Sequence, residues 1–337
     1  MIKCTSKQPI AFHFFISPYP LKHIGKGNKK DMKREQPLFR GCGTALVTPF
    51  YHGQIDYTAL GELIDWQIAS GVNALIAAGT TGEAPTLTED EKIDVIRFTV
   101  KKTAGRVPVI AGTGSNNTAY AVRLSVAAEA AGADGILVIT PYYNKTSQAG
   151  LVAHFTTIAD ATSLPLLIYH IPSRTGMRIA PQTFCTLSHH PRIVGVKEAC
   201  GDLNQIMQLF ELCGDQLDIY SGNDEQVYPL LAMGGCGVIS AVSNILPDKM
   251  SQICRLYDEG KTAQAQQLQL SILPLIRVMF SEVNPIPVKE ALYQMNMIHR
   301  EYRLPLFPMD AKGARNVQEQ LRLHARLPEF PDIPELP

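Results

Sequence analysis

Short apolar runs alternate with amphipathic stretches along the chain from Arg40 onward. Each run is rich in Val, Ile and Leu and shows no clean alternation of polar and apolar positions. That pattern is typical of parallel strands buried on both faces, so each run predicts a strand. Eight runs fit this description, at residues 43–50, 72–79, 107–114, 135–141, 164–172, 193–199, 217–223 and 237–244.

The stretches between these runs carry helical signals. Leu60, Leu63 and Ile64 recur at helical spacing, and Thr88 with Glu91 three residues later forms a capping-box pattern that predicts a helix start. Eight strand–helix units match the size and period of a (β/α)8 TIM barrel, which is an α/β fold. An open doubly wound sheet is the alternative. The glycine-rich phosphate turn usual in that fold does not follow the first strand, which ends in VTPFYHG.

Strand signals stop after Gly260, and helical patterns follow. We therefore expect a catalytic barrel over residues 39–260 and a small C-terminal helical domain over residues 261–337. The first thirty residues differ, because six lysines precede the first acidic residue, Asp31. We expect residues 1–38 to be a disordered N-terminal extension. A start at Met32 and a signal or transit segment are the alternatives.

The composition narrows the classes of function. Lysine plus arginine total 31 and aspartate plus glutamate total 31, so the formal net charge is zero and no basic surface suggests nucleic acid. The seven cysteines are scattered without a C-x-x-C pair, which favours free thiols in a reducing cytoplasm. No apolar run reaches the ~18 residues that a membrane span needs. We expect a cytoplasmic protein that acts on small molecules and binds neither membrane nor nucleic acid.

Lys197 lies at the end of the sixth predicted strand, in the string IVGVKEA. Side chains alternate along a strand, so Lys197 and Glu198 point to opposite faces, one of them into the barrel. An inward lysine is costly to bury as a cation and lowers that cost by staying neutral, and a neutral amine is the nucleophile that carbonyl chemistry needs. For this string alone, a surface cation is the alternative.

Further polar residues follow the C-terminal ends of strands, where (β/α)8 enzymes carry their chemistry. Tyr169 lies just inside the end of the fifth strand, and its phenol can both donate and accept a proton. His170 faces the opposite way, and we assign it no role. Arg174 follows in a loop, where a guanidinium suits bidentate capture of a carboxylate. Core packing and a surface arginine are the alternatives for Tyr169 and Arg174.

Thr80 and Thr81 stand between two glycines after the second strand, in AAGTTGEAPTL. Glycines allow the backbone to approach a ligand closely, and successive amides can bind a carboxylate. An ordinary tight turn is the alternative. Tyr142 and Tyr143 follow the fourth strand, where aromatic rings usually cover a lid, an interface or a substrate. No set of Asp, Glu and His residues recurs at metal-ligand spacing on the strand ends, so we predict no metal.

Together these strings resemble the pyruvate-dependent class I lyase family, which includes N-acetylneuraminate lyase. The similarity runs from about Phe39 to the C-terminus, and the order and spacing of the motifs are more specific than any one of them. The motifs are GTTGE (79–83), AGTG (111–114), TPYYN (140–144), PSRTG (172–176), GVKEA (195–199) and NPIPVK (284–289).

The resemblance implies a (β/α)8 lyase that joins pyruvate to an aldehyde without any cofactor. Lys197 would form the imine with pyruvate. Tyr169, Thr81 and Tyr143 would form a hydroxyl relay, with Tyr143 reaching into the site of a neighbouring subunit of a homotetramer, a dimer of dimers. Contacts to the substrates would come from Thr80, Thr81, Arg174, Gly222 and Ile239.

The arginine of PSRTG points to one branch of the family. In that branch the arginine holds the carboxylate of L-aspartate 4-semialdehyde, and the product is 4-hydroxy-tetrahydrodipicolinate, the first committed step of the diaminopimelate and lysine pathway. Two other functions stay open. One is another pyruvate aldolase of the family, such as N-acetylneuraminate lyase or a 2-keto-3-deoxy sugar-acid aldolase. The other is a non-catalytic barrel that senses a keto acid.

The resemblance also bears on regulation, because many family members bind lysine at a dimer interface and are inhibited by it. Asn116 and Tyr142 match positions of that site. Tyr120 stands where an acid would pair with the amine of the effector, and Lys92 adds like charge beside it. Ala84 and Glu89 also depart from the residues of lysine-sensitive forms. We therefore predict weak or absent feedback by lysine.

Overall fold

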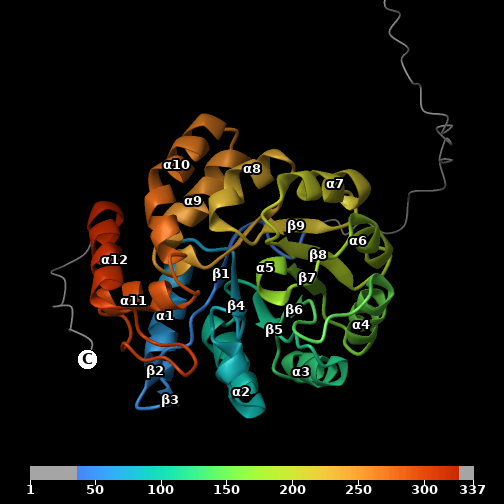
Figure 1. Ribbon diagram of the computed structural model, residues 1–337, viewed down its shortest axis with the longest axis horizontal. Coiled ribbons are helices and arrows are strands. Elements are labelled where there is room, and N and C mark those ends of the chain that lie inside the picture. The colour runs from blue at the N-terminus through green and yellow to red at the C-terminus, as the bar shows by residue number, and fades with distance from the viewer. Residues whose placement is uncertain (1–35, 326–337) are drawn as a thin grey trace, which may run out of the picture. The chain divides into compact units, whose positions relative to one another are not determined.

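The computed structural model describes residues 36–325. Within this part of the chain, eight parallel strands form a closed barrel in the order β1-β10-β9-β8-β7-β6-β5-β4, which confirms the predicted (β/α)8 fold over the open sheet. Figure 1 shows the strands inside a ring of helices. The barrel strands are β1 (Gly41–Ala45), β4 (Ala74–Ala77), β5 (Val109–Gly112), β6 (Gly135–Ile139), β7 (Leu166–His170), β8 (Ile193–Glu198), β9 (Asp218–Ser221) and β10 (Gly237–Ser240).

Seven of the eight predicted runs contain one barrel strand each, and the first run overlaps its strand only in part. That run was expected over residues 43–50, whereas β1 ends at Ala45. Phe50 instead begins a small antiparallel hairpin of β2 (Phe50–Tyr51) and β3 (Gln54–Ile55). The two residues between them, His52 and Gly53, have φ values of 50° and 77°, which the tight turn of a two-residue hairpin requires.

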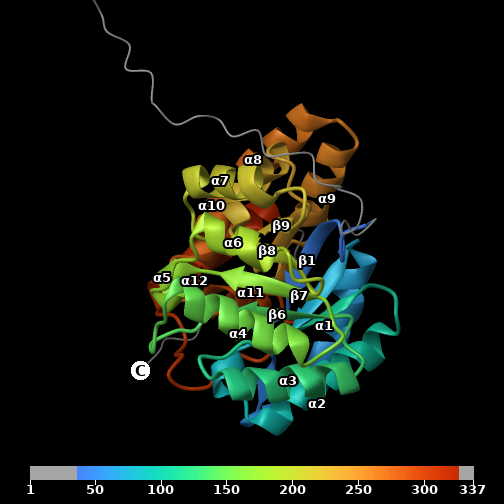
Figure 2. The same ribbon diagram turned by 90° about the vertical axis from the view of Figure 1, so that its right-hand side faces the viewer.

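Helices connect successive strands and cover the outside of the barrel, as Figure 2 shows from the side. The capping box at Thr88 is confirmed, because its hydroxyl accepts the N–H of Glu91 at 3.2 Å while the Glu91 carboxylate accepts the N–H of Thr88 at 2.9 Å. The helices are α1 (Tyr57–Ala69), α2 (Glu89–Thr103), α3 (Thr118–Ala130), α4 (Gln148–Asp160), α5 (Pro172–Thr175), α6 (Pro181–Leu187), α7 (Leu203–Cys213), α8 (Val227–Ala232) and α9 (Pro247–Asp258), with short 3-10 turns at η1 (Ala84–Thr86), η2 (Asp224–Gln226) and η3 (Val242–Asn244).

Alternation along each strand divides the apolar residues between two cores. On β7, Leu167 and Tyr169 belong to the cluster inside the barrel, whereas Leu166 and Ile168 belong to the cluster between the strands and the helices. Both faces of the strand are therefore buried, as the unbroken apolar runs predict. The alternation also decides which polar side chains at a strand end face the barrel interior.

Phe39 closes the barrel at the N-terminal ends of its strands. Its ring stacks on the ring of Tyr220 from β9 with centroids 4.4 Å apart. The Tyr220 hydroxyl donates to the carbonyl of Phe39 at 2.6 Å. Both residues are buried and belong to the interior cluster. The polar end of the barrel interior therefore lies at the opposite, C-terminal ends of the strands.

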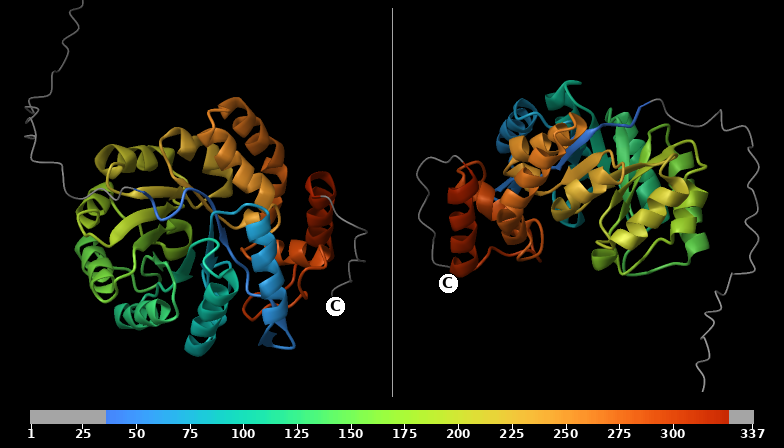
Figure 3. Two further views of the ribbon diagram at one scale, coloured as in Figure 1. Left: turned by 180° about the vertical axis from the view of Figure 1, so that it is seen from behind. Right: turned by 90° about the horizontal axis from the view of Figure 1, so that it is seen from above.

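Three helices follow the barrel: α10 (Thr262–Met279), α11 (Ile286–Gln294) and α12 (Ala311–His324). Their apolar faces share one buried cluster with β1, β10 and α9. Figure 3 shows α12 at the outer edge beside α10 and α11. The division into domains at residue 260 stays a prediction. The expected extension over residues 1–38 falls almost wholly outside the described residues. Among these, no helix combines the length and hydropathy that a membrane span requires.

Candidate active site

Lys197 points into the barrel, as predicted, and its side chain is buried there. The residue is 7% exposed, and its Nζ atom lies over the ring of Tyr169. Burial lowers the pKa of Lys197 to about 8, while the nearby carboxylate of Asp224 acts in the opposite direction and Arg174 lowers the pKa further. Desolvation disfavours the ammonium form, so a sizeable share of the amine is neutral near physiological pH. A neutral primary amine at this position can attack a carbonyl carbon.

Tyr169 lies beside Lys197 because their two strands pair in register. Their Cα atoms are partners in the β7–β8 ladder, and the Lys197 Nζ atom is 4.3 Å from the centre of the Tyr169 ring. Burial raises the pKa of Tyr169 to about 12, while Arg174 and a hydrogen bond with the Thr80 side chain lower it. The phenol therefore keeps its proton at neutral pH and, with Thr80 beside its oxygen, can donate that proton to a reacting group.

The loop after β4 brings Thr80 and Thr81 to the same end of the barrel. Thr81 is buried, and its Oγ1 accepts a hydrogen bond from the Nδ2 of Asn284 at 2.9 Å. Thr80 is half-buried and bonds with Tyr169 through its side chain. The two predicted threonines thus lie on one turn. The side chain that interacts with Tyr169 is that of Thr80, however, and not that of Thr81, the threonine of the predicted relay.

Arg174 lies on the one-turn helix α5, at the exposed rim of the same end. Its Nη2 donates to the backbone carbonyl of Asn284 at 2.9 Å. Asn284 therefore contacts both Thr81 and Arg174, and its own Oδ1 is buried without a hydrogen-bond partner among the described residues. Sequence reasoning gave this asparagine no role, although it opens the motif NPIPVK. Asn284 lies far along the sequence from the barrel strands, and no sequence pattern connects it with the residues at their ends.

Gly222 lies against the Lys197 side chain, and Ile239 belongs to the barrel interior. A Cβ atom on Gly222 would lie 2.7 Å from the Cβ of Ala199 and 3.1 Å from the Cγ of Lys197. A side chain there would force Ala199 to shift and would press on the stem of Lys197. Ile239 on β10 is fully buried in the interior cluster that also holds Tyr169. Gly222 therefore borders the lysine side chain and Ile239 lies in the barrel interior, and the predicted contacts of both residues with the substrates stay a prediction.

Asp224 is a buried acid near the amine that sequence reasoning missed. It follows β9, two residues after Gly222, and is 1% exposed. Its carboxylate accepts hydrogen bonds from the Ser240 hydroxyl and from the N–H of Ala241 at 3.2 Å. Burial raises the pKa of Asp224, and Lys197 lowers it. The string SGND directly after a strand carried the signal, since polar residues at strand ends mark the reactive end of this fold.

Tyr143 does not join the site within the single chain. It lies in the loop after β6 with 93% of its surface exposed and a φ of 67°. A non-glycine residue with positive φ is uncommon and presents its side chain on a strained turn. The predicted contribution of Tyr143 to a neighbouring subunit stays a prediction.

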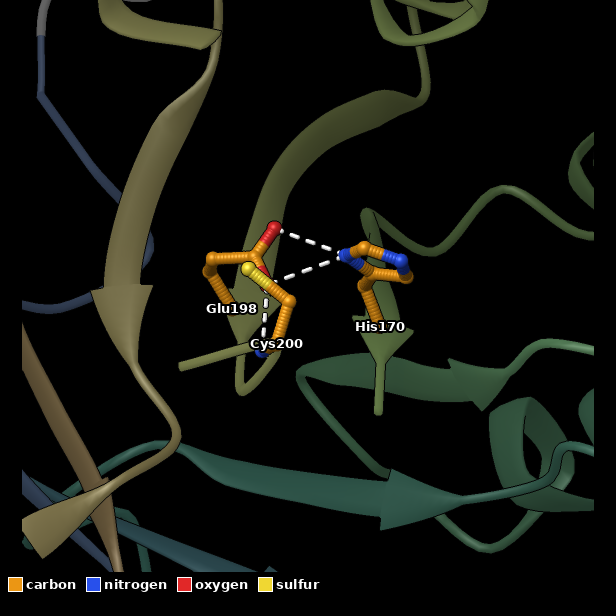
Figure 4. A group of neighbouring side chains, drawn as sticks. All are labelled: His170, Glu198 and Cys200. Atoms are coloured by element: carbon orange, nitrogen blue, oxygen red, sulfur yellow. Dashed lines mark hydrogen bonds and ion pairs between the residues drawn. The ribbon is translucent and has the colours of Figure 1, made fainter. Parts of the chain in front are cut away.

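His170, Glu198 and Cys200 form a second polar cluster on the outer side of the two catalytic strands (Figure 4). The His170 Nδ1 lies 2.8 Å from a Glu198 oxygen, the His170 Nε2 accepts the N–H of Ile179 at 3.2 Å, and the Glu198 Oε1 accepts the N–H of Cys200 at 2.7 Å. These residue types also bind metals. Here the three residues hydrogen-bond to one another. The His170–Glu198 pair links β7 to β8 on the face of the strands opposite to Tyr169 and Lys197.

Four of the six residues compared with the lysine-binding position line a pocket beside the site, whereas Asn116 and Glu89 do not. Its wall includes Lys92, Tyr120 and Tyr142, and it extends to Thr80 and Tyr169. The Lys92 Nζ donates to the Tyr120 hydroxyl at 3.2 Å and also lies 5.2 Å from the centre of its ring. The ammonium of Lys92 therefore stands at this wall, as the sequence suggested.

A (β/α)8 barrel with a buried, inward lysine beside a tyrosine and two threonines defines the class of imine-forming barrel enzymes. The profile of the Dihydrodipicolinate synthetase family matches residues 38–324. The chain belongs to this family.

Curated relatives and a solved structure agree with that assignment. A protein of Thermoanaerobacter sp. (strain X514) named 4-hydroxy-tetrahydrodipicolinate synthase is 49% identical over 294 residues, which cover 87% of this chain and 99% of the relative. A protein of that name from Nitratidesulfovibrio vulgaris (strain DP4) is 51% identical over 84% of this chain and 97% of its own length. The structure of the chloride-inhibited dihydrodipicolinate synthase from Acinetobacter baumannii complexed with pyruvate is 40% identical, with a TM-score of 0.82 over 84% of this chain and 98% of that one.

Proposed function

We propose that this chain is a Schiff-base lyase that condenses pyruvate with L-aspartate 4-semialdehyde to give 4-hydroxy-tetrahydrodipicolinate. The observation that carries the proposal is the buried amine of Lys197 over the ring of Tyr169, inside the barrel and at its reactive end. The shared name of the curated relatives and the pyruvate complex of the Acinetobacter baumannii protein support the same substrate and reaction.

The reaction follows from the chemistry of a neutral amine. The Nζ of Lys197 attacks the keto carbon of pyruvate, and the carbonyl oxygen leaves as water after Tyr169 and the threonine hydroxyls deliver protons to it. The protonated imine draws electrons from the neighbouring methyl group, which loses a proton to give an enamine. The enamine carbon attacks the aldehyde carbon, whose oxygen takes up a proton. The substrate's amine then attacks the imine carbon and closes the ring, and Lys197 leaves as the free amine.

The surrounding residues bind the two carboxylates and restrict the space. The amides at Thr80 and Thr81 hold the carboxylate of pyruvate, and Arg174 at the rim holds the carboxylate of the aldehyde substrate. Gly222 and Ile239 form the wall against which pyruvate packs. The imine itself serves as the electron sink, so this mechanism uses no metal and no organic cofactor.

We further propose that the working form is a cytoplasmic homotetramer built as a dimer of dimers. The loop after β6 presents Tyr143 almost fully exposed, where a neighbouring subunit can receive it. A tyrosine delivered from the partner would complete the hydroxyl relay with Thr81 and Tyr169. Sedimentation of the wild type and of Tyr143→Phe, together with their rates, tests this: a tetramer with a slowed Phe variant is expected, and a fully active monomer would contradict it.

Two measurements test the proposed reaction. A coupled assay with pyruvate and aspartate semialdehyde should show turnover by the wild type and a loss of about 10³-fold or more in Lys197→Ala. Borohydride added with pyruvate should reduce the imine and leave a covalent mass gain on Lys197 of the wild type alone. Binding of pyruvate without any reducible adduct would instead support the keto-acid sensor. Turnover of N-acetylneuraminate or a sugar acid in place of aspartate semialdehyde would support the other aldolases.

A further inference from the structure

Lys289 is the second buried lysine in the described part of the chain, and it contacts a carboxylate directly. Its Nζ lies 2.5 Å from the Oε1 of Glu83, and the two side chains are 1% and 0% exposed. The same ammonium donates to the backbone carbonyl of Thr48 at 3.1 Å and lies 4.4 Å from the centre of the Phe50 ring. Lys289 belongs to α11, so this pair joins the helical segment after the barrel to the loop after β4.

Glu83 holds an uncommon backbone conformation that these contacts maintain. Its φ is 55°, in the left-handed region that disfavours residues with a Cβ atom. The second carboxylate oxygen accepts the backbone N–H of Arg303 at 3.2 Å, and the N–H of Glu83 donates to the carbonyl of Thr80 at 3.1 Å. Both oxygens are therefore bound by groups from the C-terminal segment. Such a conformation persists where its surroundings determine it.

The turn at Glu83 is continuous with the two threonines of the site. The carbonyl of Gly82 accepts the Thr48 hydroxyl at 2.7 Å, so Lys289 reaches this turn a second time through Thr48. Thr81, two residues before Glu83, presents its hydroxyl to the described site, and Thr80 bonds with Tyr169.

Arg303 fixes the other end of the same loop. Its guanidinium binds both oxygens of Glu91 at 2.7 and 2.6 Å and donates to the carbonyl of Thr86 at 3.1 Å. These hydrogen bonds lower the pKa of Glu91 to about 2. The C-terminal segment thus holds the loop at Glu83 and again where α2 begins.

We propose that Lys289 is a positioning residue, which fixes the Glu83 turn and thereby sets the placement of the Thr80 and Thr81 amides around the carboxylate of pyruvate. This inference rests on the proposed function. Lys289 is fully buried and acts through Glu83 rather than on the substrate. Removing one member of a buried ion pair leaves the other charge without compensation, so the turn must move or Glu83 must take up a proton.

The test is the concentration of pyruvate that gives half the maximal rate of borohydride trapping. Lys289→Met should raise this concentration by about tenfold, because displaced backbone amides at Thr80 and Thr81 bind the carboxylate of pyruvate less well. A purely structural role would lower only the amount of protein that can be trapped at saturating pyruvate, since correctly folded molecules would bind as before. The double variant Lys289→Met/Glu83→Gln removes both charges, which favours folding, and should keep the raised concentration.

Arg277→Ala is the matched control, because its ion pair with Glu225 also involves the C-terminal helices but is 69% and 50% exposed. It should behave as the wild type. A wild-type half-saturating concentration in Lys289→Met would overturn the inference, and should that variant not fold, the same value in the double variant would overturn it. Trapping of the wild type distinguishes failure of the proposed function from failure of this inference. If the wild type forms no adduct with pyruvate, the proposed function is wrong. If it forms the adduct, the Lys289 variants test only the positioning role.

Discussion

The Nζ of Lys197 lies 4.3 Å from the centre of the Tyr169 ring because the two residues are register partners on neighbouring barrel strands. Parallel pairing places their side chains side by side on the interior face. In the proposed reaction β8 therefore supplies the nucleophile and the neighbouring β7 supplies the proton donor. The geometry of the chemical step is set by sheet register, which the apolar residues on both faces of these strands hold in place.

Lys197 should reduce the stability of the protein at neutral pH. Its pKa is lowered in the folded state, so between about pH 8 and the unfolded value the unfolded chain binds more protons and stability rises with pH. Below about pH 8 the full cost of the buried ammonium is present. Lys197→Met should therefore raise the free energy of unfolding at pH 7 by about 1–3 kcal/mol. Urea unfolding of both proteins should show this advantage shrinking toward pH 10; an advantage that grew with pH would contradict the assignment.

Tyr169→Phe should slow the reaction while leaving the fold intact. The phenol is buried and bonds with Thr80, so its loss removes the proton relay but little volume. We expect the kcat of the coupled assay to fall by about 10²- to 10³-fold. Borohydride should still trap pyruvate on Lys197, more slowly than in the wild type. An unchanged kcat would exclude Tyr169 from the relay.

Arg174→Ala should affect the second substrate more than the first. The guanidinium lies at the rim, where a carboxylate can reach it. We expect the KM for aspartate semialdehyde to rise by about tenfold or more, with trapping of pyruvate nearly unchanged. Arg178→Ala, four residues on, is the control, because Arg178 bonds with Gln205 away from the site. Equal effects of the two substitutions would argue against substrate binding by Arg174.

Gly222→Ala should reduce activity through direct contact with the nucleophile. The new Cβ would lie within 3.1 Å of the Lys197 Cγ and within 2.7 Å of the Ala199 Cβ. We expect a loss of kcat/KM of about 10- to 100-fold with a modest fall in Tm. Gly61→Ala on α1 is the control, since a Cβ there makes only ordinary contacts at 3.4 Å with the Lys102 and Phe98 side chains and alanine favours helix. Full activity in Gly222→Ala would mean that Lys197 can move away without consequence.

L-Lysine should inhibit this enzyme weakly or not at all. Lys92 bonds with Tyr120 at the wall of the pocket, and the guanidinium of Arg123 lies 5.2 Å from the centre of the same ring. Two cations near this wall disfavour a third from the ligand. Assays with sub-millimolar lysine should change the rate by less than about twofold. Clear inhibition in that range would refute the prediction. Measuring the rate of Lys92→Met against the concentration of L-lysine would then show whether this pocket binds the inhibitor.

Pattern alone was sufficient for the barrel. Eight apolar runs predicted eight strands, and alternation put Lys197 and Glu198 on opposite faces of their strand. The choice of Lys197 as the inward residue came from the other polar residues at the strand ends, not from alternation. These features depend on neighbours in sequence, so a single chain reveals them. The small hairpin at Phe50 was missed, because two-residue strands carry no periodicity.

Contacts between distant segments could not be read in this way. Asn284 reaches Thr81 across 203 positions, and Lys289 reaches Glu83 across 206. A polar residue in a helical segment looks the same whether it faces water or an acid from another loop. Tyr143 poses a different problem, since its proposed partner lies in another molecule.

The stacked rings of Phe39 and Tyr220, with the rest of the interior cluster, fill the barrel at the N-terminal ends of its strands, so the site opens only at the C-terminal ends. Pyruvate, aspartate semialdehyde, water and product must all pass through one mouth, so binding is expected to be ordered, with the deeper substrate first. Replacing Phe39 by alanine should loosen this packing at the N-terminal end. Any water that then entered the interior would stabilise the ammonium form of Lys197 and raise its pKa, so residues far from the substrate would influence the reactivity of the amine.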